Sequence, residues 1–158
     1  MRLLRWCCLP LLITWMGVAL AQGEAIRLAP WTLLDQFDRP YTLEPDLRVL
    51  LVARGMDASG LLDEALAELG GDYLERHSVV FLADISGMPA PIASLFAVPA
   101  MRDYGYRVML DRSGRVASRY PGEKAELLWL DLDNGELRGQ RQFTDAGALR
   151  QALQALGQ

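Results

Sequence analysis

The stretch that decides the fold is RVLLVARGMDASGLLDEALAELGG, residues 48–71. Its first part, 48–53, is a continuous apolar run, which is typical of a strand buried on both faces of a sheet. Gly55 interrupts the run. Apolar residues then recur at helical spacing over 61–69, and Gly70-Gly71 ends the pattern. The segment predicts a central strand, a loop and a helix.

The following segment repeats this order. Residues 78–84, SVVFLAD, predict a second buried strand, and Gly87-Met-Pro89 breaks it. Residues 90–98 then predict a helix that carries Ile92, Leu95 and Phe96 on one side. Strand, helix, strand and helix in this order favour two parallel strands joined by a right-handed crossover.

The rest of the chain has the pattern of antiparallel sheet. Short strands are expected at 107–111, 115–120, 126–132 and 136–143. Asn134-Gly135 predicts a tight hairpin turn, because both turn positions need positive φ. Asp145 is placed to cap a final helix. Upstream, Asp38-Arg39-Pro40 lies between two short β-prone pieces and predicts an N-terminal hairpin.

The first 21 residues have the pattern of a signal peptide. Arg2 and Arg5 precede an apolar run over 6–21, and Ala19-Leu20-Ala21 supplies the small residues that signal peptidase requires. An uncleaved anchor is the alternative, but the run is shorter than the roughly 20 residues that span a bilayer. We therefore expect an exported, periplasmic protein whose single domain covers 22–158.

Both cysteines, Cys7 and Cys8, lie in the segment expected to be removed, so the mature chain has no thiol. The sequence also has only one histidine, so zinc, haem and iron–sulfur sites are not expected. Without Arg2 and Arg5, 16 − 2 = 14 basic residues face 20 acidic ones, a net charge of −6. Such a balance disfavours nucleic acid as a partner.

Two phrases carry a resemblance to a known family. LLDQFDRP, residues 33–40, resembles the hairpin that opens peroxiredoxin and TlpA-type proteins, and MLDRSGRV, residues 109–116, resembles a later hairpin of theirs. LDRSGRV followed by LWLDLDNGEL is most similar to YtfJ-like periplasmic proteins. The resemblance implies an α/β, thioredoxin-like three-layer fold with a mixed central sheet, an N-terminal hairpin and flanking helices.

The chain departs from that family at the redox site. In redox-active members a Cys-x-x-Cys opens the first core helix, whose N-terminus favours the thiolate. Here the place is taken by GMDASG, residues 55–60. A cis-proline normally precedes the next strand, where this chain has 103–106, DYGY. We therefore expect a redox-inactive binding or interaction module that uses residues 54–60 and 99–107.

Candidate binding residues follow from this placement, and no catalytic residue is assigned. They are Arg54, Asp57, Ser59, Asp84, Tyr104 and Tyr106. Asp57 or Ser59 can instead merely cap the helix, and the tyrosines can instead be sheet packing. Ser59 with His77 as a hydrolase pair is not expected, because His77 lies at the far end of the predicted sheet.

Two further possibilities remain at this stage. Similar short exported proteins carry a flavin-dehydrogenase label, so a flavin-dependent oxidoreductase is the alternative function. However, Gly55-x-x-x-x-Gly60 is neither a dinucleotide fingerprint nor a P-loop, and no cofactor is assigned. A structural envelope protein is a third possibility. The acidic residues over 131–136 lack the spacing of a calcium loop and are expected to form a turn.

Overall fold

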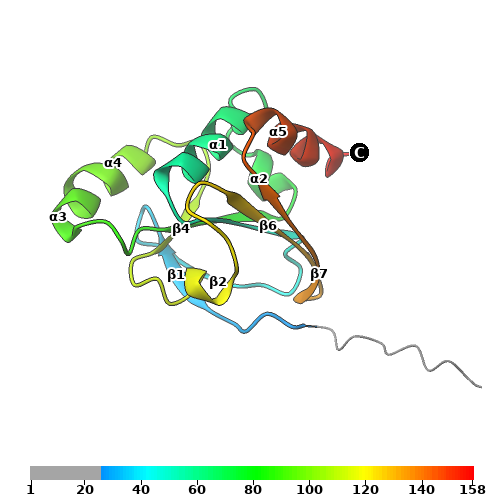
Figure 1. Ribbon diagram of the computed structural model, residues 1–158, viewed down its shortest axis with the longest axis horizontal. Coiled ribbons are helices and arrows are strands. Elements are labelled where there is room, and N and C mark those ends of the chain that lie inside the picture. The colour runs from blue at the N-terminus through cyan, green and yellow to red at the C-terminus, as the bar shows by residue number, and fades with distance from the viewer. Residues whose placement is uncertain (1–25) are drawn as a thin grey trace, which may run out of the picture.

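The computed structural model describes residues 26–158 (Figure 1), so the predicted signal peptide lies outside the described part. Seven strands form one sheet in the order β2-β1-β5-β4-β3-β6-β7. Their bounds are Thr32–Asp35 (β1), Pro40–Thr42 (β2), Val49–Ala53 (β3), Val79–Asp84 (β4), Val108–Asp111 (β5), Leu127–Asp133 (β6) and Glu136–Phe143 (β7).

The centre of the sheet is parallel and its margins are antiparallel. β3 pairs with β4 and β4 pairs with β5 in parallel, which confirms the predicted parallel pair. The predicted N-terminal hairpin, β1 and β2, joins the free edge of β5 in antiparallel register. β6 and β7 extend the other side. The carboxyl ends of the three parallel strands therefore share one edge, and their amino ends share the opposite one.

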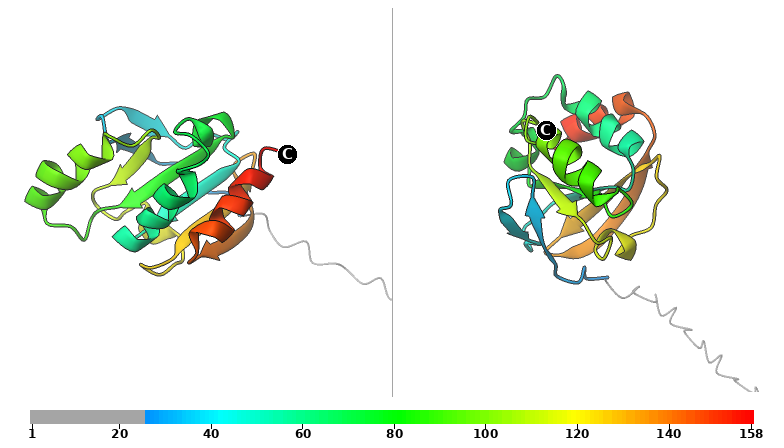
Figure 2. Two further views of the ribbon diagram at one scale, coloured as in Figure 1. Left: turned by 90° about the horizontal axis from the view of Figure 1, so that it is seen from above. Right: turned by 90° about the vertical axis from the view of Figure 1, so that its left-hand side faces the viewer.

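Helices lie on the sheet and beyond its edge (Figures 1 and 2). They are α1 (Met56–Leu66), α2 (Tyr73–Arg76), α3 (Ala90–Ile92), the π-helix η1 (Ala93–Ala97), α4 (Val98–Met101), the 3₁₀-helix η2 (Ala117–Arg119) and α5 (Ala146–Ala155). α1 and α5 pack side by side on one face. As predicted, Asp145 caps α5, since its Oδ1 accepts a hydrogen bond from the Ala148 amide at 2.7 Å.

The core has two halves because side chains of a strand alternate between faces. Val49 and Leu51 of β3 join the cluster under α1 and α5, whereas Leu50 and Val52 join the cluster on the other face. All five residues of β3 are buried, as expected for a central strand. Between residues 26 and 158, no helix is long and apolar enough to cross a membrane.

The strand predicted at 115–120 is wrong. Asp111, fully buried at the end of β5, accepts hydrogen bonds from the Val116 and Ala117 amides at 2.8 and 2.9 Å. These bonds fold the chain back at once into η2 instead of letting it extend. By contrast, the predicted Asn134-Gly135 turn joins β6 to β7, with φ of 51° and 77° at the two residues.

Two expectations about helices are corrected. Neither Asp57 nor Ser59 caps α1, whose N-cap is Gly55 and has no side-chain cap. The predicted helix over 90–98 is present, but the side with Ile92, Leu95 and Phe96 faces outward, with 47%, 67% and 66% exposure. The buried residues of this helical segment are Ala93 and Val98.

Candidate functional site: a pocket at the amino edge of the parallel strands

The structure places the sequence-predicted residues at two opposite edges of the sheet. Arg54 follows β3 and Asp84 ends β4, so both lie at the carboxyl edge, where α1 with Asp57 and Ser59 begins. Tyr104 and Tyr106 precede β5 and lie at the amino edge. The two predicted segments, 54–60 and 99–107, therefore do not form one site.

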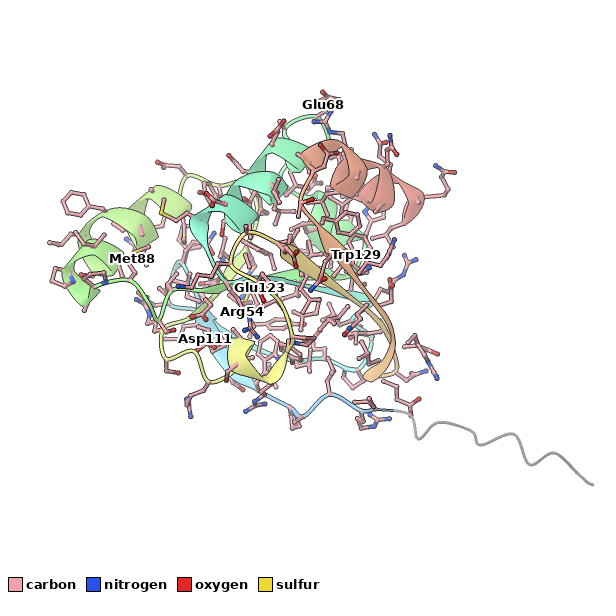
Figure 3. The ribbon with its side chains drawn as sticks, viewed as in Figure 1. Arg54, Glu68, Met88, Asp111, Glu123 and Trp129 are labelled. Carbon is pink, nitrogen blue, oxygen red and sulfur yellow. The ribbon has the colours of Figure 1, made fainter. Side chains whose placement is uncertain are left out.

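At the carboxyl edge, three of the predicted residues form hydrogen bonds with nearby parts of the same chain. The Arg54 guanidinium donates to the carbonyls of Ala117 and Tyr120, which ties η2 to the end of β3 (Figure 3). Asp84 accepts the Ser86 amide at 2.9 Å, and Ser59 donates back to the Gly55 carbonyl at 3.2 Å. Arg54, Asp84 and Ser59 thus hold the local chain in shape.

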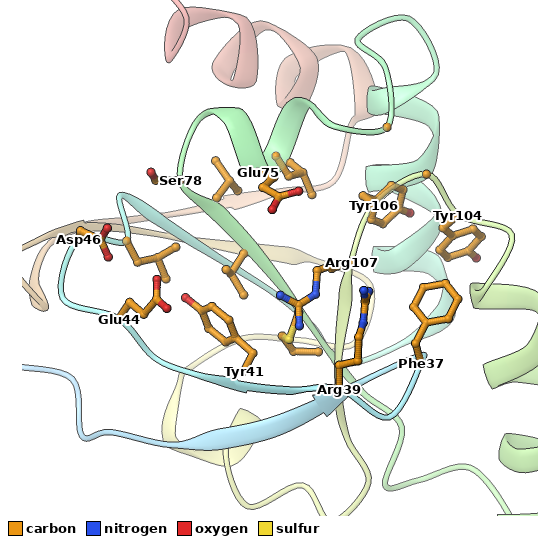
Figure 4. Close-up of a pocket in the computed structure, with 17 residues that line it drawn as sticks. Phe37, Arg39, Tyr41, Glu44, Asp46, Glu75, Ser78, Tyr104, Tyr106 and Arg107 are labelled. Carbon is orange, nitrogen blue, oxygen red and sulfur yellow. The ribbon is translucent and has the colours of Figure 1, made fainter.

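The amino edge contains a cavity of about 520 Å³ between the β1–β2 hairpin, α2 and the segment before β5 (Figure 4). Its polar and aromatic lining comes from Phe37, Arg39, Tyr41, Glu44, Asp46, Glu75, Ser78, Tyr104, Tyr106 and Arg107. A cavity of this size fits a small molecule. Tyr104 and Tyr106 are the two sequence-predicted residues that line it.

Asp35 organises the polar side of this cavity from beneath. The carboxylate is fully buried and accepts the amides of Phe37 and Arg39 at 2.8 and 2.9 Å. It also accepts the Nε–H of Arg39 at 3.0 Å and of Arg107 at 2.9 Å. Burial alone raises the pKa of Asp35, but these hydrogen bonds outweigh it and lower the pKa below its ordinary value.

The two arginines are held by Asp35 and extend into the cavity (Figure 4). Within residues 26–158, neither has a hydrogen-bond or ion-pair partner other than Asp35. Each also lies over an aromatic ring, Arg39 at 4.9 Å from the centroid of Phe37 and Arg107 at 5.9 Å from that of Tyr41. Both guanidinium groups therefore have donors left for a ligand.

Gln36 fastens the hairpin to the segment that carries the tyrosines. Its buried amide donates to the Tyr106 carbonyl at 2.8 Å and accepts the Val108 amide at 2.9 Å. Its Nε2 also donates to the Met101 carbonyl at 3.3 Å, so this side chain positions both the end of α4 and residues 106–108. The Asp35-Gln36 pair of the LLDQFDRP phrase is therefore the element that builds the pocket wall.

Aromatic rings form one end of the cavity. The rings of Tyr104 and Tyr106 stack with centroids 5.2 Å apart. Burial, and then the nearby charge of Asp63, raise the pKa of both tyrosines. The Tyr106 hydroxyl is buried and has no hydrogen-bond partner within the described residues. Both hydroxyls therefore stay neutral near pH 7.

Acidic residues form the other end. Glu44, Asp46 and Glu75 line the cavity there, and no ion pair joins them to a basic group in the described part of the chain. Burial is the main cause that raises the pKa of Tyr41 to about 12, and the charges of Glu44 and Asp46 act in the same direction. Among residues 26–158, no group of three His, Cys, Asp or Glu could hold a metal ion.

Comparison with known proteins gives the fold. No protein-family model and no curated protein matches the sequence. Among solved structures, a hypothetical protein from Sinorhizobium meliloti is similar at 23% identity and a TM-score of 0.57, covering 84% of this chain and 82% of that one. Peroxidoxin BcpB from Mycobacterium tuberculosis is similar at 14% identity and a TM-score of 0.55, over 84% and 95% of the two chains.

A thio-disulfide isomerase from Thermus thermophilus is also similar, with 18% identity, a TM-score of 0.51 and coverage of 84% and 96%. This chain has a thioredoxin-like fold. In the thioredoxin-like domain, the pocket lies at the opposite end of the parallel strands from the start of α1, where the resemblance would place redox cysteines. The pocket is thus separate from the redox position.

Sequence reasoning found the two tyrosines of the pocket and missed the polar residues. Asp35, Gln36 and Arg39 stand in a phrase that predicts the N-terminal hairpin, and the apolar pattern places Arg107 at the start of a strand. The available signal was an acidic residue followed by an amide inside a β-prone stretch, where alternation places one of the two toward the core. A buried polar side chain of this kind needs partners, which points to a built polar site.

Proposed function

We propose that this chain is an exported thioredoxin-like domain that binds a small ligand in the amino-edge pocket without thiol chemistry. The observation that carries the proposal is the pair of guanidinium groups held by one buried carboxylate. The two arginine side chains are 59% and 36% exposed and share one carboxylate, so the pair keeps a net positive charge that attracts an anion. The residues that bind are Arg39, Tyr41, Tyr104, Tyr106 and Arg107.

The start of α1 supports a role that does not use thiols. Cys7 and Cys8 are the only cysteines of the sequence, and both precede the expected cleavage site. In addition, a Cβ atom on Gly55 would lie 2.6 Å from the Lys124 carbonyl oxygen. The loop around Lys124 thus packs against the residue before the helix and leaves it no room for a side chain.

Export rests on the signal-peptide pattern of residues 1–21 and on the resemblance of the paired late phrases to YtfJ-like periplasmic proteins. Purification of the full-length gene product from the periplasm of a Gram-negative host tests it. We expect a mature chain that begins at Gln22. A full-length chain that remains in the cytoplasm would refute export.

Native mass spectrometry of the same gently purified protein tests binding. We expect added mass from a small molecule in the wild type and a bare chain for Arg107→Gln, while Arg138→Gln, an exposed arginine in β7, keeps the added mass. If wild type is bare, a thermal-shift screen of small metabolites follows. The binding proposal fails if no compound distinguishes wild type from Arg107→Gln. Visible flavin absorbance would instead favour the alternative oxidoreductase.

A further inference from the structure

The pocket presents three kinds of surface in a fixed order, and we propose that its ligand is a zwitterion with a large apolar group. The matching chemical class is an α-amino acid or short peptide whose carboxylate lies on Arg39 and Arg107. Its ammonium group faces Glu44 and Glu75, and its side chain lies against Phe37 and Tyr104. This inference rests on the proposed binding function and names the ligand class for the same site.

The charge at the arginine pair fits one carboxylate. Arg39 and Arg107 contribute +2, and Asp35 beneath them contributes −1, so the pair carries a net +1 toward the cavity. A carboxylate cancels this charge, whereas a phosphate dianion leaves an excess of negative charge in a pocket that already has acidic residues. Planar guanidinium groups also match the geometry of a carboxylate.

The acidic end calls for a cation on the same ligand. Glu44, Asp46 and Glu75 together carry −3 and have no basic partner in the described part of the chain. Figure 4 shows Glu44 and Asp46 on the side of the arginines that is away from Phe37 and Tyr104, and Glu75 above Arg107. These carboxylates are exposed and need no partner, but they attract an ammonium group placed beside them and repel a second anion.

The third surface is apolar. Phe37 is 44% exposed although it lies in a turn held by buried groups, and Tyr104 stacks on Tyr106 opposite it (Figure 4). An exposed aromatic ring beside a stacked pair gains free energy when an apolar side chain covers it. The arginines stand between this surface and the acidic end, which places the ligand's carboxylate in the middle.

A purely structural role for the arginines is the competing explanation. In that case Arg39 and Arg107 only neutralise Asp35, and the cavity has no preference among small molecules. Ligand analogues measured on the unchanged protein separate the two explanations, because they leave the fold intact. L-phenylalanine carries all three groups, L-phenylalanine amide lacks the carboxylate, and N-acetyl-L-phenylalanine lacks the ammonium group.

Isothermal titration calorimetry of the mature chain with these three compounds, and with the dipeptide Ala-Phe, is the test. We expect L-phenylalanine, Ala-Phe or both to bind, which tells a free amino acid from a peptide. Loss of the carboxylate should weaken binding at least about tenfold, and loss of the ammonium group about threefold. Glu75→Gln, an exposed residue of α2, should reproduce the second loss, and Arg138→Gln should have no effect.

The inference is overturned if neither L-phenylalanine nor Ala-Phe binds, or if L-phenylalanine amide binds as well as L-phenylalanine. Equal binding of the N-acetyl compound would likewise overturn the part assigned to the acidic residues. These failures differ from failure of the proposed function. A compound of another class that binds wild type but not Arg107→Gln would leave the binding function standing and refute only the ligand class.

Discussion

At the scale of single residues, Asp35 holds more of the pocket together than any other side chain described above. We expect Asp35→Asn to lower the free energy of unfolding by about 2 kcal/mol, because the buried carboxylate accepts two amides and two guanidinium groups that a neutral amide cannot all satisfy. Urea denaturation measures the change. Asp38→Asn is the matched control in the same turn: its carboxylate is exposed and lies 3.7–3.8 Å from Arg112 and Arg102, so its removal should cost less than about 0.5 kcal/mol.

The same carboxylate predicts a pH dependence. Because folding lowers the pKa of Asp35 below 3.8, its contribution to stability is present above that pH and is lost as pH falls below it. Urea midpoints measured between pH 5 and pH 2 should fall less steeply for Asp35→Asn than for wild type. Parallel curves for the two proteins would contradict the role given to Asp35.

Tyr41 predicts a change of stability in the opposite direction, a loss as the pH rises into the alkaline range. Its pKa rises from 10.0 to about 12 on folding, so it stabilises the fold below pH 10 and this contribution is lost as pH rises toward 12. Replacement by phenylalanine should reduce the loss of stability between these two pH values. Denaturation midpoints of Tyr41→Phe and wild type at pH 9 and pH 11 provide the comparison, and an equal drop in both would count against burial of this hydroxyl.

At the scale of elements, two glycines fix how closely the pocket walls approach. A Cβ atom on Gly71 would lie 2.6 Å from the Cα and carbonyl oxygen of Gly105, and both residues line the cavity. Gly71→Ala should therefore destabilise the protein by about 1–3 kcal/mol and weaken ligand binding. Gly60→Ala, in α1 with nothing within 4 Å, should instead stabilise it by up to about 1 kcal/mol. Thermal unfolding of the two variants shows which one is destabilised and which one is stabilised.

Elements with a strong internal pattern could be predicted from the sequence. β3, β4 and the β6–β7 hairpin follow from apolar runs and from Asn134-Gly135. The strand expected at 115–120 is absent because Asp111 takes the Val116 and Ala117 amides, so the chain turns. The sequence pattern also did not predict that Leu95 and Phe96 of η1 face outward, for a related reason. Periodicity shows that Leu95 and Phe96 share a side and does not show whether that side is buried.

At the scale of the whole molecule, the parallel order of β3, β4 and β5 decides which candidates can act together. The resemblance grouped residues 54–60 with 99–107 because it places both beside the redox site, but residues 54–60 follow a strand and residues 103–106 precede one. The pocket depends on partners far apart in the chain, such as Arg107 and Asp35, which are 72 residues apart. No local pattern carries such a pairing, so the site became visible only in the fold.

The central claim is that this thioredoxin-like domain binds its ligand at the amino edge of the parallel strands. An NMR titration of the ¹⁵N-labelled mature chain with L-phenylalanine tests it most directly, because each backbone amide reports its own surroundings. We predict saturable shifts in residues 37–39, in Tyr41, in residues 104–107 and in Glu75, with none in residues 55–60. Saturable shifts confined to residues 55–60 would contradict the account, whereas no shift with either L-phenylalanine or Ala-Phe would refute the ligand class proposed above.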